Sequence, residues 1–176
     1  RGWTAIGVET PRPDASEPLT EDNGMPRIVY CDLEMQVPAC LEPGSFDVIH
    51  SSHVLEHVSH LLPFLRSCQR FIKPDGRLII EVPNEYESGS AMMKRLLGKR
   101  YKSKTAFCGH RFFFTPATLA VALRAGGWQV LSMETPFICH GRGLVHQAWD
   151  RMQSKLGKGL AIAVVCSPMV ATGGEK

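Results

Sequence analysis

Three histidines and a glutamate lie in the stretch HVLEHVSH, residues 53–60, near the middle of the chain. Its first five residues match the string H-x-x-E-H, in which two histidines on one helix bind zinc and the glutamate is the base of a class of proteases. That chemistry requires both histidines to face the metal from the same helix. His53 directly follows the strand-like run FDVIHSS, and helical spacing becomes clear only near Leu61. We therefore expect no shared helix and no protease site.

A second group of chemically useful residues lies further along the chain. His110 stands in the run CGHRFFF, and histidine titrates in the range that suits a general base. The span 88–133 has no Asp or Glu but eight basic residues, which are Lys94, Arg95, Lys99, Arg100, Lys102, Lys104, Arg111 and Arg124. In a chain of formal net charge +3, this concentration favours an anionic ligand over this face. The alternative is an ordinary solvated basic surface.

The bulk composition excludes several classes of protein. A chain of 176 residues with 44% hydrophobic composition predicts one domain, residues 1–176, with a single core. The net charge of +3 is too small to indicate a nucleic-acid partner. Six scattered cysteines without a C-x-x-C pair argue against a zinc ribbon or disulfide scaffold and fit reduced thiols in a cytoplasmic protein. The apolar run LAIAVVC is too short to span a bilayer, and no signal-peptide pattern is seen.

The first half of the chain predicts a parallel sheet. Four apolar runs, rich in Val and Ile, have the character of strands buried on both faces, and they cover residues 3–9, 27–34, 46–52 and 77–83. An amphipathic helix is predicted over about 59–73, between the last two strands. The sequence KPDG (73–76) predicts its stop and a turn into the next strand. Strand, helix and strand in this order form a right-handed crossover.

The second half predicts one helix and two closing strands. Thr115 can cap the helix, Pro116 suits its first turn, and the AGG sequence at 125–127 ends it. Residues 128–134 and 160–168 have strand character. The polar and basic segment of about 85–111 precedes this helix, and we expect it to form a lid.

The order and spacing of three pieces carry a family resemblance: FDVIHSSHVLEHV, FIKPDGRLIIEVPN and GHRFFFTPATLAVALRAGGWQVL. Together they resemble the class I S-adenosylmethionine-dependent methyltransferases, in the branch that acts on small molecules. The resemblance implies an α/β fold with a Rossmann-like, doubly wound sheet, mostly parallel with an antiparallel C-terminal strand. It also implies that S-adenosylmethionine binds at the carboxyl ends of the strands. No Gly-rich loop precedes GWTAIGVE, so we expect the family's first strand and Gly-rich loop to be missing.

The resemblance assigns cofactor contacts to six residues. Glu9 would bind the ribose hydroxyls, Asp32 the adenine amine and Leu33 the adenine ring. The residues that follow the third strand would lie beneath the methionine part of the cofactor, and these are Ser51, Ser52 and His53. The alternatives are an ordinary exposed carboxylate for Glu9 and a turn-capping role for Asp32.

A metal at the HVLEH stretch is left open. Family members that methylate phenolic hydroxyls carry Glu-x-x-Glu-His here, taken to hold a divalent ion, and this chain has His53 in place of the first Glu. A set of His53, Glu56 and His57 would suit zinc or another transition ion better than magnesium. The alternative is that Glu56 and His57 hydrogen-bond local backbone or each other. From the sequence we assign no metal ligand.

The implied chemistry is an in-line displacement at a sulfonium carbon. The cofactor supplies the methyl group, and the protein positions the partners and takes up a proton. His57 is the first candidate for the base and His110 the second. We expect methylation of an oxygen or nitrogen of a small molecule, with an anionic acceptor as a further hypothesis. The competing functions are a non-catalytic binding protein with this fold and a metal-dependent hydrolase at the HVLEH stretch.

Overall fold

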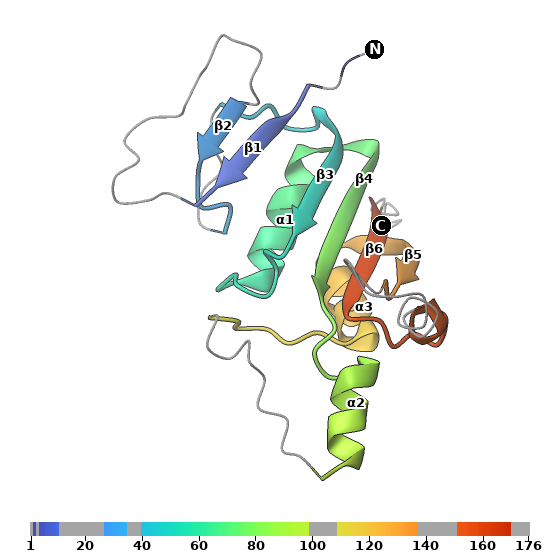
Figure 1. The fold of residues 1–176 in the computed structure, drawn as a ribbon. Helices are drawn as coiled ribbons and strands as arrows, with labels where there is room; N and C mark the ends of the chain where they lie inside the picture. The colour runs from blue at the N-terminus through green and yellow to red at the C-terminus, as the bar shows by residue number, and fades with distance from the viewer. Residues whose placement is uncertain are drawn as a thin grey trace, which may run out of the picture.

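The computed structural model describes residues 2, 4–10, 27–34, 40–98, 109–136 and 151–169. In these residues six strands form two separate sheets, one of two strands and one of four. The small sheet pairs β1 (Ile6–Glu9) with β2 (Arg27–Tyr30). The larger sheet has the order β3-β4-β6-β5, with bounds Phe46–Ser52, Ile72–Pro83, Ala161–Pro168 and Trp128–Glu134 (Figure 1). No helix among the described residues is long and apolar enough to cross a bilayer.

The strand directions confirm the predicted mixed α/β arrangement. β1 is parallel to β2 and β3 is parallel to β4, whereas β6 is antiparallel to both of its neighbours. The expected antiparallel C-terminal strand is therefore present. The sheet is divided between β1 and β3, because the described residues place no strand between them.

An amphipathic helix, α1 (Leu61–Phe71), packs against β4 and supplies part of the core. Its buried side chains follow helical spacing and are Phe64, Leu65, Cys68 and Phe71. The indole Nε1 of Trp128, at the start of β5, donates a 3.0 Å hydrogen bond to the Leu65 carbonyl and ties the helix to the sheet. Burial raises the pKa of the Cys68 thiol, and that of Cys166 in β6, to about 12. Both side chains therefore pack as small apolar groups.

The predicted helix stop at KPDG is confirmed, because α1 ends at Phe71, but residues 73–76 belong to β4 and not to a separate turn before it. β4 begins at Ile72, directly after α1. Phe46 pairs with Ile72 but Val48 pairs with Arg77, so the extra residues of β4 form an irregularity in the register. Lys73 Nζ lies 2.7 Å from Asp47 Oδ1, which holds this segment against β3 and keeps the pKa of Asp47 below its usual range. Residues 73–76 therefore oppose the single residue Asp47 and form a bulge, in which the chain folds back within β4.

The helix predicted after Thr115 is confirmed as α3 (Pro116–Ala125). The Thr115 side chain accepts from the Thr118 backbone, and the Thr118 side chain accepts in return from the Thr115 backbone, which makes a reciprocal cap. Gly127 follows with φ of +84°, a left-handed conformation that glycine adopts without steric cost. The end predicted at the AGG sequence is therefore also confirmed.

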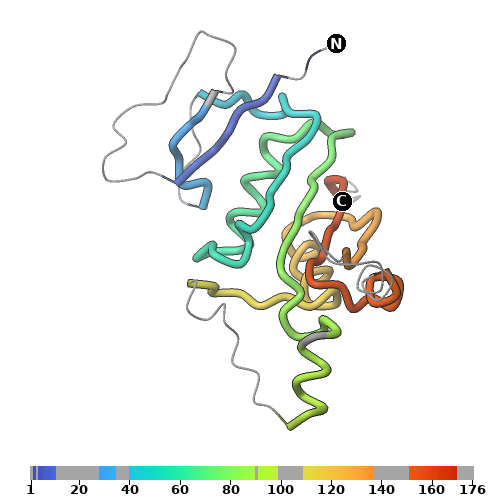
Figure 2. The backbone as a smooth tube through the Cα atoms, in the orientation of Figure 1, coloured from blue at the N-terminus to red at the C-terminus, as the bar shows by residue number. Residues whose placement is uncertain are grey.

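One helix within the predicted lid was not expected. α2 (Gly89–Leu96) starts after Ser88, whose side chain accepts a hydrogen bond from the Ala91 backbone. The spacing of apolar residues did not predict α2, because the apolar side chains of this helix do not form a buried stripe and Leu96 is 80% exposed. Lys99, Arg100, Lys102 and Lys104 of the lid lie outside the described residues. In Figure 2 the backbone beyond the lid, residues 109–115 (yellow), passes beside the turn that follows β3 and then enters α3.

Candidate functional site

The turn that leaves β3 places the HVLEH stretch at the carboxyl end of the sheet. His53 has φ of +53° and is the one non-glycine residue with a positive φ in the described part of the chain. Its backbone N–H donates to the Glu81 carbonyl of β4, and the His57 N–H donates to the Val54 carbonyl, closing a tight turn. α1 begins only at Leu61. His53 and His57 therefore share no helix, as predicted, and the geometry of an H-x-x-E-H protease is absent.

A second segment docks onto this turn. The backbone N–H groups of Arg111 and Phe112 both donate to the Glu56 carbonyl, at 2.7 and 3.1 Å. This contact holds the neighbouring His110 beside His57, with ring centroids 4.7 Å apart and planes nearly perpendicular. His57 and His110 are the two histidines predicted as candidate bases. They are 53 residues apart in the chain and lie in direct contact in the structure.

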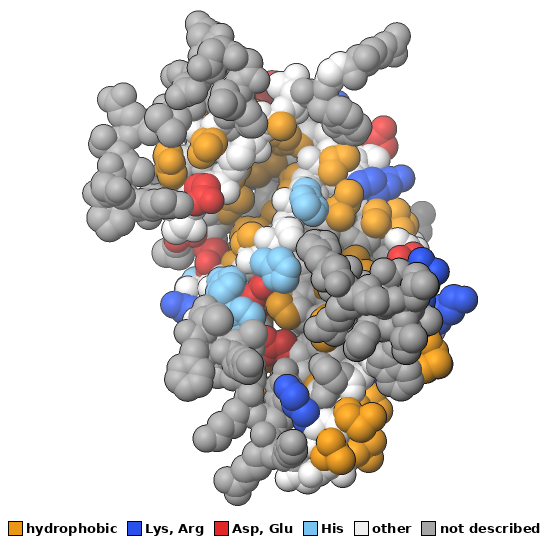
Figure 3. All heavy atoms as spheres, in the orientation of Figure 1, with side chains coloured by type: hydrophobic (Ala, Val, Ile, Leu, Met, Phe, Trp, Pro, Cys, Tyr) orange, Lys and Arg blue, Asp and Glu red, His pale blue; other side chains and the backbone are white. Residues whose placement is uncertain are grey.

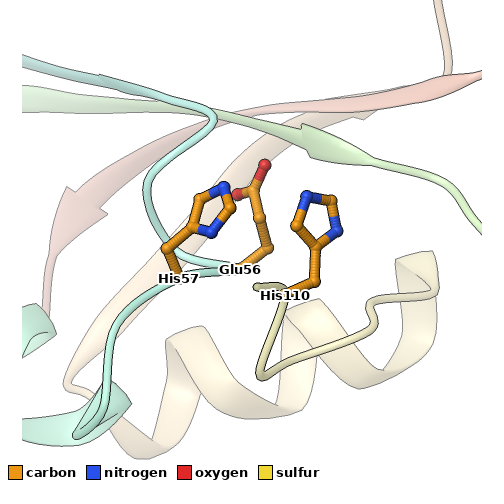
Figure 4. Close-up of side chains that lie close together, drawn as sticks. All are labelled: Glu56, His57 and His110. Carbon is orange, nitrogen blue, oxygen red and sulfur yellow. The ribbon is translucent and has the colours of Figure 1, made fainter. Parts of the chain in front are cut away.

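Two buried glutamates complete the cluster. Glu56, which is 1% exposed, lies beside the rings of His57 and His110, as Figure 4 shows. One ligand atom from each of these three residues falls within 4.8 Å of the others. Glu56 Oε1 lies 3.1 Å from His53 Nδ1, whereas Oε2 is buried and has no hydrogen-bond partner among the described residues. A buried carboxylate oxygen without a partner is costly, so this atom marks the cluster as a place for chemistry.

Glu85 is a functional candidate that the sequence analysis missed. Its Oε1 lies 2.9 Å from His110 Nδ1, and the two side chains are only 5% and 8% exposed. The preceding residue fixes this position, because the Asn84 N–H donates to the Leu160 carbonyl and its side-chain amide to the Gly159 carbonyl. The sequence could have identified Glu85 by its position directly after EVPN, at the end of a parallel strand.

The pair of Glu85 and His110 has a definite chemical consequence. A carboxylate accepts only from a protonated nitrogen, so we assign the Nδ1–H tautomer to His110. The Nε2 lone pair is then available on the other side of the ring. That side faces Glu56 and His57 in Figure 4, and the cluster can therefore take up a proton or hold a cation. Figure 3 shows histidine and acidic side chains gathered together on this face of the molecule.

The residues predicted to hold adenosine end two neighbouring strands of the small sheet. Glu9 is the last residue of β1 and is exposed, and its carbonyl accepts from the Cys31 N–H. Asp32 follows β2, and its Oδ1 accepts from the Glu34 N–H at 2.9 Å, which is the turn-capping alternative. Leu33 is half-buried and packs against both core clusters. In Figure 1, β1, β2 and β3 all end toward the same side of the molecule.

The residues predicted beneath the methionine part project in different directions. Ser51 is buried and lines a cleft between the two sheets, where its Oγ has no hydrogen-bond partner among the described residues. Ser52 is exposed and its Oγ lies 3.5 Å from Glu81 Oε2, on the opposite face of β3. The His53 side chain turns to Glu56. The structure thus unites the two predicted bases but separates the side chains of the predicted methionine site.

Comparisons with known proteins agree with this architecture. A family model described as a methyltransferase domain matches residues 1–133. The ubiquinone biosynthesis O-methyltransferase of Xanthomonas euvesicatoria pv. vesicatoria is 28% identical over 114 residues, which cover 63% of this chain and 44% of that protein. The ubiquinone biosynthesis O-methyltransferase of Xanthomonas oryzae pv. oryzae strain PXO99A is 27% identical over 133 residues, covering 72% of this chain and 52% of its own. The chain thus spans about half the length of the curated relatives it matches.

Solved structures share the fold. An S-adenosylmethionine-dependent methyltransferase from Mesorhizobium loti superposes with a TM-score of 0.58 at 17% identity, covering 94% of this chain and 81% of its own. The 1,6-didemethyltoxoflavin-N1-methyltransferase of Burkholderia thailandensis, solved with S-adenosylhomocysteine, gives a TM-score of 0.50 at 16% identity, with coverages of 82% and 51%. Because the family model covers well over half of the residues, the chain belongs to the methyltransferase-domain family.

Proposed function

We propose that this chain carries the catalytic part of an S-adenosylmethionine-dependent methyltransferase that acts on an oxygen or nitrogen of a small molecule. The observation that carries the proposal is the buried pair of Glu85 and His110 beside His57, at the carboxyl end of β3 and β4. In doubly wound sheets, ligands bind outside the carboxyl ends of the strands. A base oriented by a carboxylate at that edge suits an acceptor that must lose a proton.

The proton is taken by His110 in this proposal. Glu85 holds the Nδ1–H, keeps the Nε2 lone pair directed into the cluster, and stabilises the imidazolium that forms. His57 contacts His110 edge-on and limits rotation of the ring. The bound cofactor supplies the electrophilic methyl group. His57, first in the order expected from the sequence, takes a positioning role, because His110 has a buried carboxylate at its Nδ1 and no such partner of His57 is seen among the described residues.

The described residues fit part of a cofactor site. Glu9 and Asp32 place carboxylates at the ends of adjacent strands, where ribose and adenine donors would reach them. The buried Ser51 hydroxyl gives an acceptor and donor within the cleft. Ser52 and His53 lie beside that cleft, and their side chains contact Glu81 and Glu56, so their part in binding would come from the backbone.

We infer that a further strand completes the sheet between β1 and β3. The cleft there is mainly apolar, and it is lined by Ile6 and Val8 of β1 and by Val48 and Ile49 of β3. Val8 and Val48 are exposed in the described residues, and each strand is paired along one edge only. A strand running parallel to both would cover these side chains and pair both edges. The Gly-rich loop expected from the family would follow such a strand.

Charge and cysteine chemistry support the proposals for the acceptor and the compartment. Arg111 stands next to His110, and Lys94 and Arg95 lie on α2, so the described lid residues support an anionic acceptor. A net charge of +3 gives no support to a nucleic-acid partner. Cys40, Cys68 and Cys166 carry thiols and not disulfides, which supports a reducing compartment such as the cytoplasm.

The proposal is tested by cofactor titration and methyl transfer. We expect calorimetry on the full-length protein to show S-adenosylmethionine binding, and we expect methyl transfer from labelled cofactor to a member of a panel of phenols, amines and carboxylated metabolites. His110→Gln should lower kcat by roughly 100-fold or more, because a general base contributes at least that much. Glu85→Gln should lower kcat by a smaller factor, while the cofactor Kd stays within about twofold for both variants.

His60→Gln is the matched control, since His60 is an exposed histidine just before α1. It should leave kcat and the cofactor Kd unchanged. Absence of cofactor binding in the full-length wild-type protein would favour the non-catalytic binding protein. Equal kcat values for wild type and His110→Gln would remove His110 from the reaction.

A further inference from the structure

We propose that Glu34 is a positioning residue that links the predicted adenine site to the turn that carries His57. The inference rests on the proposed function, because it concerns the placement of the proposed catalytic histidines. Glu34 lies in the segment that follows β2, and both of its carboxylate oxygens accept hydrogen bonds from the turn before α1. The Ser59 N–H donates to Oε1 at 2.9 Å, and the His60 N–H donates to Oε2.

The N-terminus of α1 depends on this distant carboxylate. His60 is the N-cap residue, its side chain caps no backbone N–H among the described residues, and the first turn holds no acidic residue. Helix N-termini leave backbone N–H groups unpaired, and the partial positive charge there favours a carboxylate. Glu34 supplies the acceptors and the charge from 25 residues away in the chain. The start of α1 therefore takes its position from the segment after β2.

The turn that Glu34 holds also carries part of the proposed catalytic cluster. His57 stands two residues before Ser59, and its ring contacts the His110 ring edge-on, with centroids 4.7 Å apart. Glu56 belongs to the same turn and lies beside both rings (Figure 4). Movement of Ser59 would therefore shift His57 against His110. A displacement of about 1 Å at a reacting group can cost roughly 100-fold in rate.

The predicted adenine site meets Glu34 within the same three residues, 32–34. Asp32 Oδ1 accepts the Glu34 N–H at 2.9 Å, and Leu33 packs against both core clusters. This hydrogen bond uses one carboxylate oxygen of Asp32, and the second oxygen can accept from an adenine amine. Adenine bound there would order the segment, and that order would extend through the Glu34 side chain to Ser59 and His60.

The consequence is a coupling between cofactor binding and the placement of His57. Removal of the Glu34 side chain leaves the backbone N–H that Asp32 accepts, so the adenine contacts should remain. It removes both acceptors of the turn, so the turn should lose its fixed position. The effect of a Glu34 substitution should therefore appear in kcat and not in the cofactor Kd.

Kinetics of the full-length protein with labelled S-adenosylmethionine test this division. Glu34→Ala should lower kcat by about 10-fold or more through misplacement of the turn. Its cofactor Kd should stay within about threefold of the wild-type value. Glu34→Gln keeps one acceptor oxygen and should give an intermediate kcat. Glu42→Ala is the matched control, because Glu42 is exposed and its loss changes the net charge equally. Equal kcat values for Glu34→Ala and wild type would overturn the proposal.

A double-mutant cycle separates positioning from a loss of folded protein. If Glu34 acts through His57, Glu34→Ala should lower the kcat of a His57→Gln protein by less than about twofold. A smaller folded fraction would instead lower kcat by the same factor in both backgrounds. Equal factors would therefore overturn the positioning role. Circular dichroism checks the folding of each variant.

Hydrogen exchange tests the coupling with the cofactor alone. S-adenosylmethionine should slow amide exchange in residues 57–60 of the wild-type protein. In Glu34→Ala this slowing should be lost, while protection of β1 and β2 by the cofactor remains. Cofactor binding that protects β1 and β2 but not residues 57–60 of the wild type would overturn this inference alone. Absence of cofactor binding in the wild type would overturn the proposed function and the inference with it.

Discussion

His53 shows how one residue joins a structural and a chemical task. Its left-handed φ of +53° is a conformation in which histidine is found more often than most side chains, at a cost of roughly 1 kcal/mol or more. That conformation turns the chain sharply out of β3, where the His53 N–H still pairs with Glu81. It also directs Nδ1 to Glu56. The strained backbone of His53 therefore lies where β3 ends and the turn that carries Glu56 and His57 begins.

Ser51 allows a test at the same scale, because its buried Oγ has no partner among the described residues. On folding, the Ser51 hydroxyl loses its hydrogen bonds to water and gains none in the protein, and Ser51→Ala removes this hydroxyl. We expect the free energy of unfolding to stay equal or to rise by up to about 1 kcal/mol in urea melts. Ser52→Ala is the control on the exposed face and should change it by less than about 0.5 kcal/mol. A loss above about 1 kcal/mol for Ser51→Ala would mean that Oγ is hydrogen-bonded in solution.

At the scale of elements, α1 and α3 follow their local sequence because both have an apolar stripe to bury and a defined end. Leu119 and Leu123 of α3 are buried, and α3 packs on α1 and β5. α2 lacks such a stripe, and its exposed Met92, Met93 and Leu96 leave it dependent on the Ser88 cap and on neighbouring chain. The predictability of each helix thus follows its burial.

The cap of α3 gives the prediction for this scale. Thr115→Ala removes an acceptor for the Thr118 N–H and half of the reciprocal cap, so the free energy of unfolding should fall by about 1 kcal/mol. Val121→Ala is the control on the same helix, because Val121 is well exposed. It should cost nothing measurable, since alanine favours helix. Chemical denaturation followed by circular dichroism measures both, and equal stability of Thr115→Ala and wild type would rule out a contribution from the cap.

At the scale of the whole molecule, the two sheets differ in how far strand pairing and core packing stabilise them. β4 is paired along both edges, by β3 and β6, and lies over the main core. β1 and β2 form a two-stranded sheet of four residues each, with a small separate cluster beneath it. A two-stranded sheet is marginal without further packing. The part that carries Glu9 and Asp32 is therefore the less stable part of the described chain.

Hydrogen exchange tests this difference directly. We expect the amides of β1 and β2 to exchange by local opening well before those of β4, because few buried contacts must break. S-adenosylmethionine should slow exchange in β1 and β2 if Glu9 and Asp32 bind it. Mass spectrometry of peptic fragments gives both results. Protection of β1 equal to that of β4 in the chain alone would show that the cleft between the sheets is already closed.

The sequence by itself determined the parallel strands, the capped helix α3, the antiparallel last strand and the family resemblance. The strands and α3 depend on local periodicity and capping residues, which are written within a few consecutive residues, whereas the antiparallel direction of the last strand is implied by the family resemblance. It also excluded the protease helix, since FDVIHSS predicts a strand that runs up to His53. At KPDG it predicted the end of the helix, but not that residues 73–76 form a bulge of β4 beside Asp47, with the ion pair of Lys73 and Asp47 holding that bulge.

Only the tertiary structure decided the composition of the site. Glu56 and His110 come from segments far apart in the chain, and they meet because the Arg111 and Phe112 amides bond to the Glu56 carbonyl. Glu85 becomes a partner of His110 only once β4 has placed it at the same edge. The orphaned oxygen of Glu56 likewise depends on what surrounds it and not on its neighbours in sequence. Local preferences select elements, whereas contacts between distant residues exist only after the chain has folded.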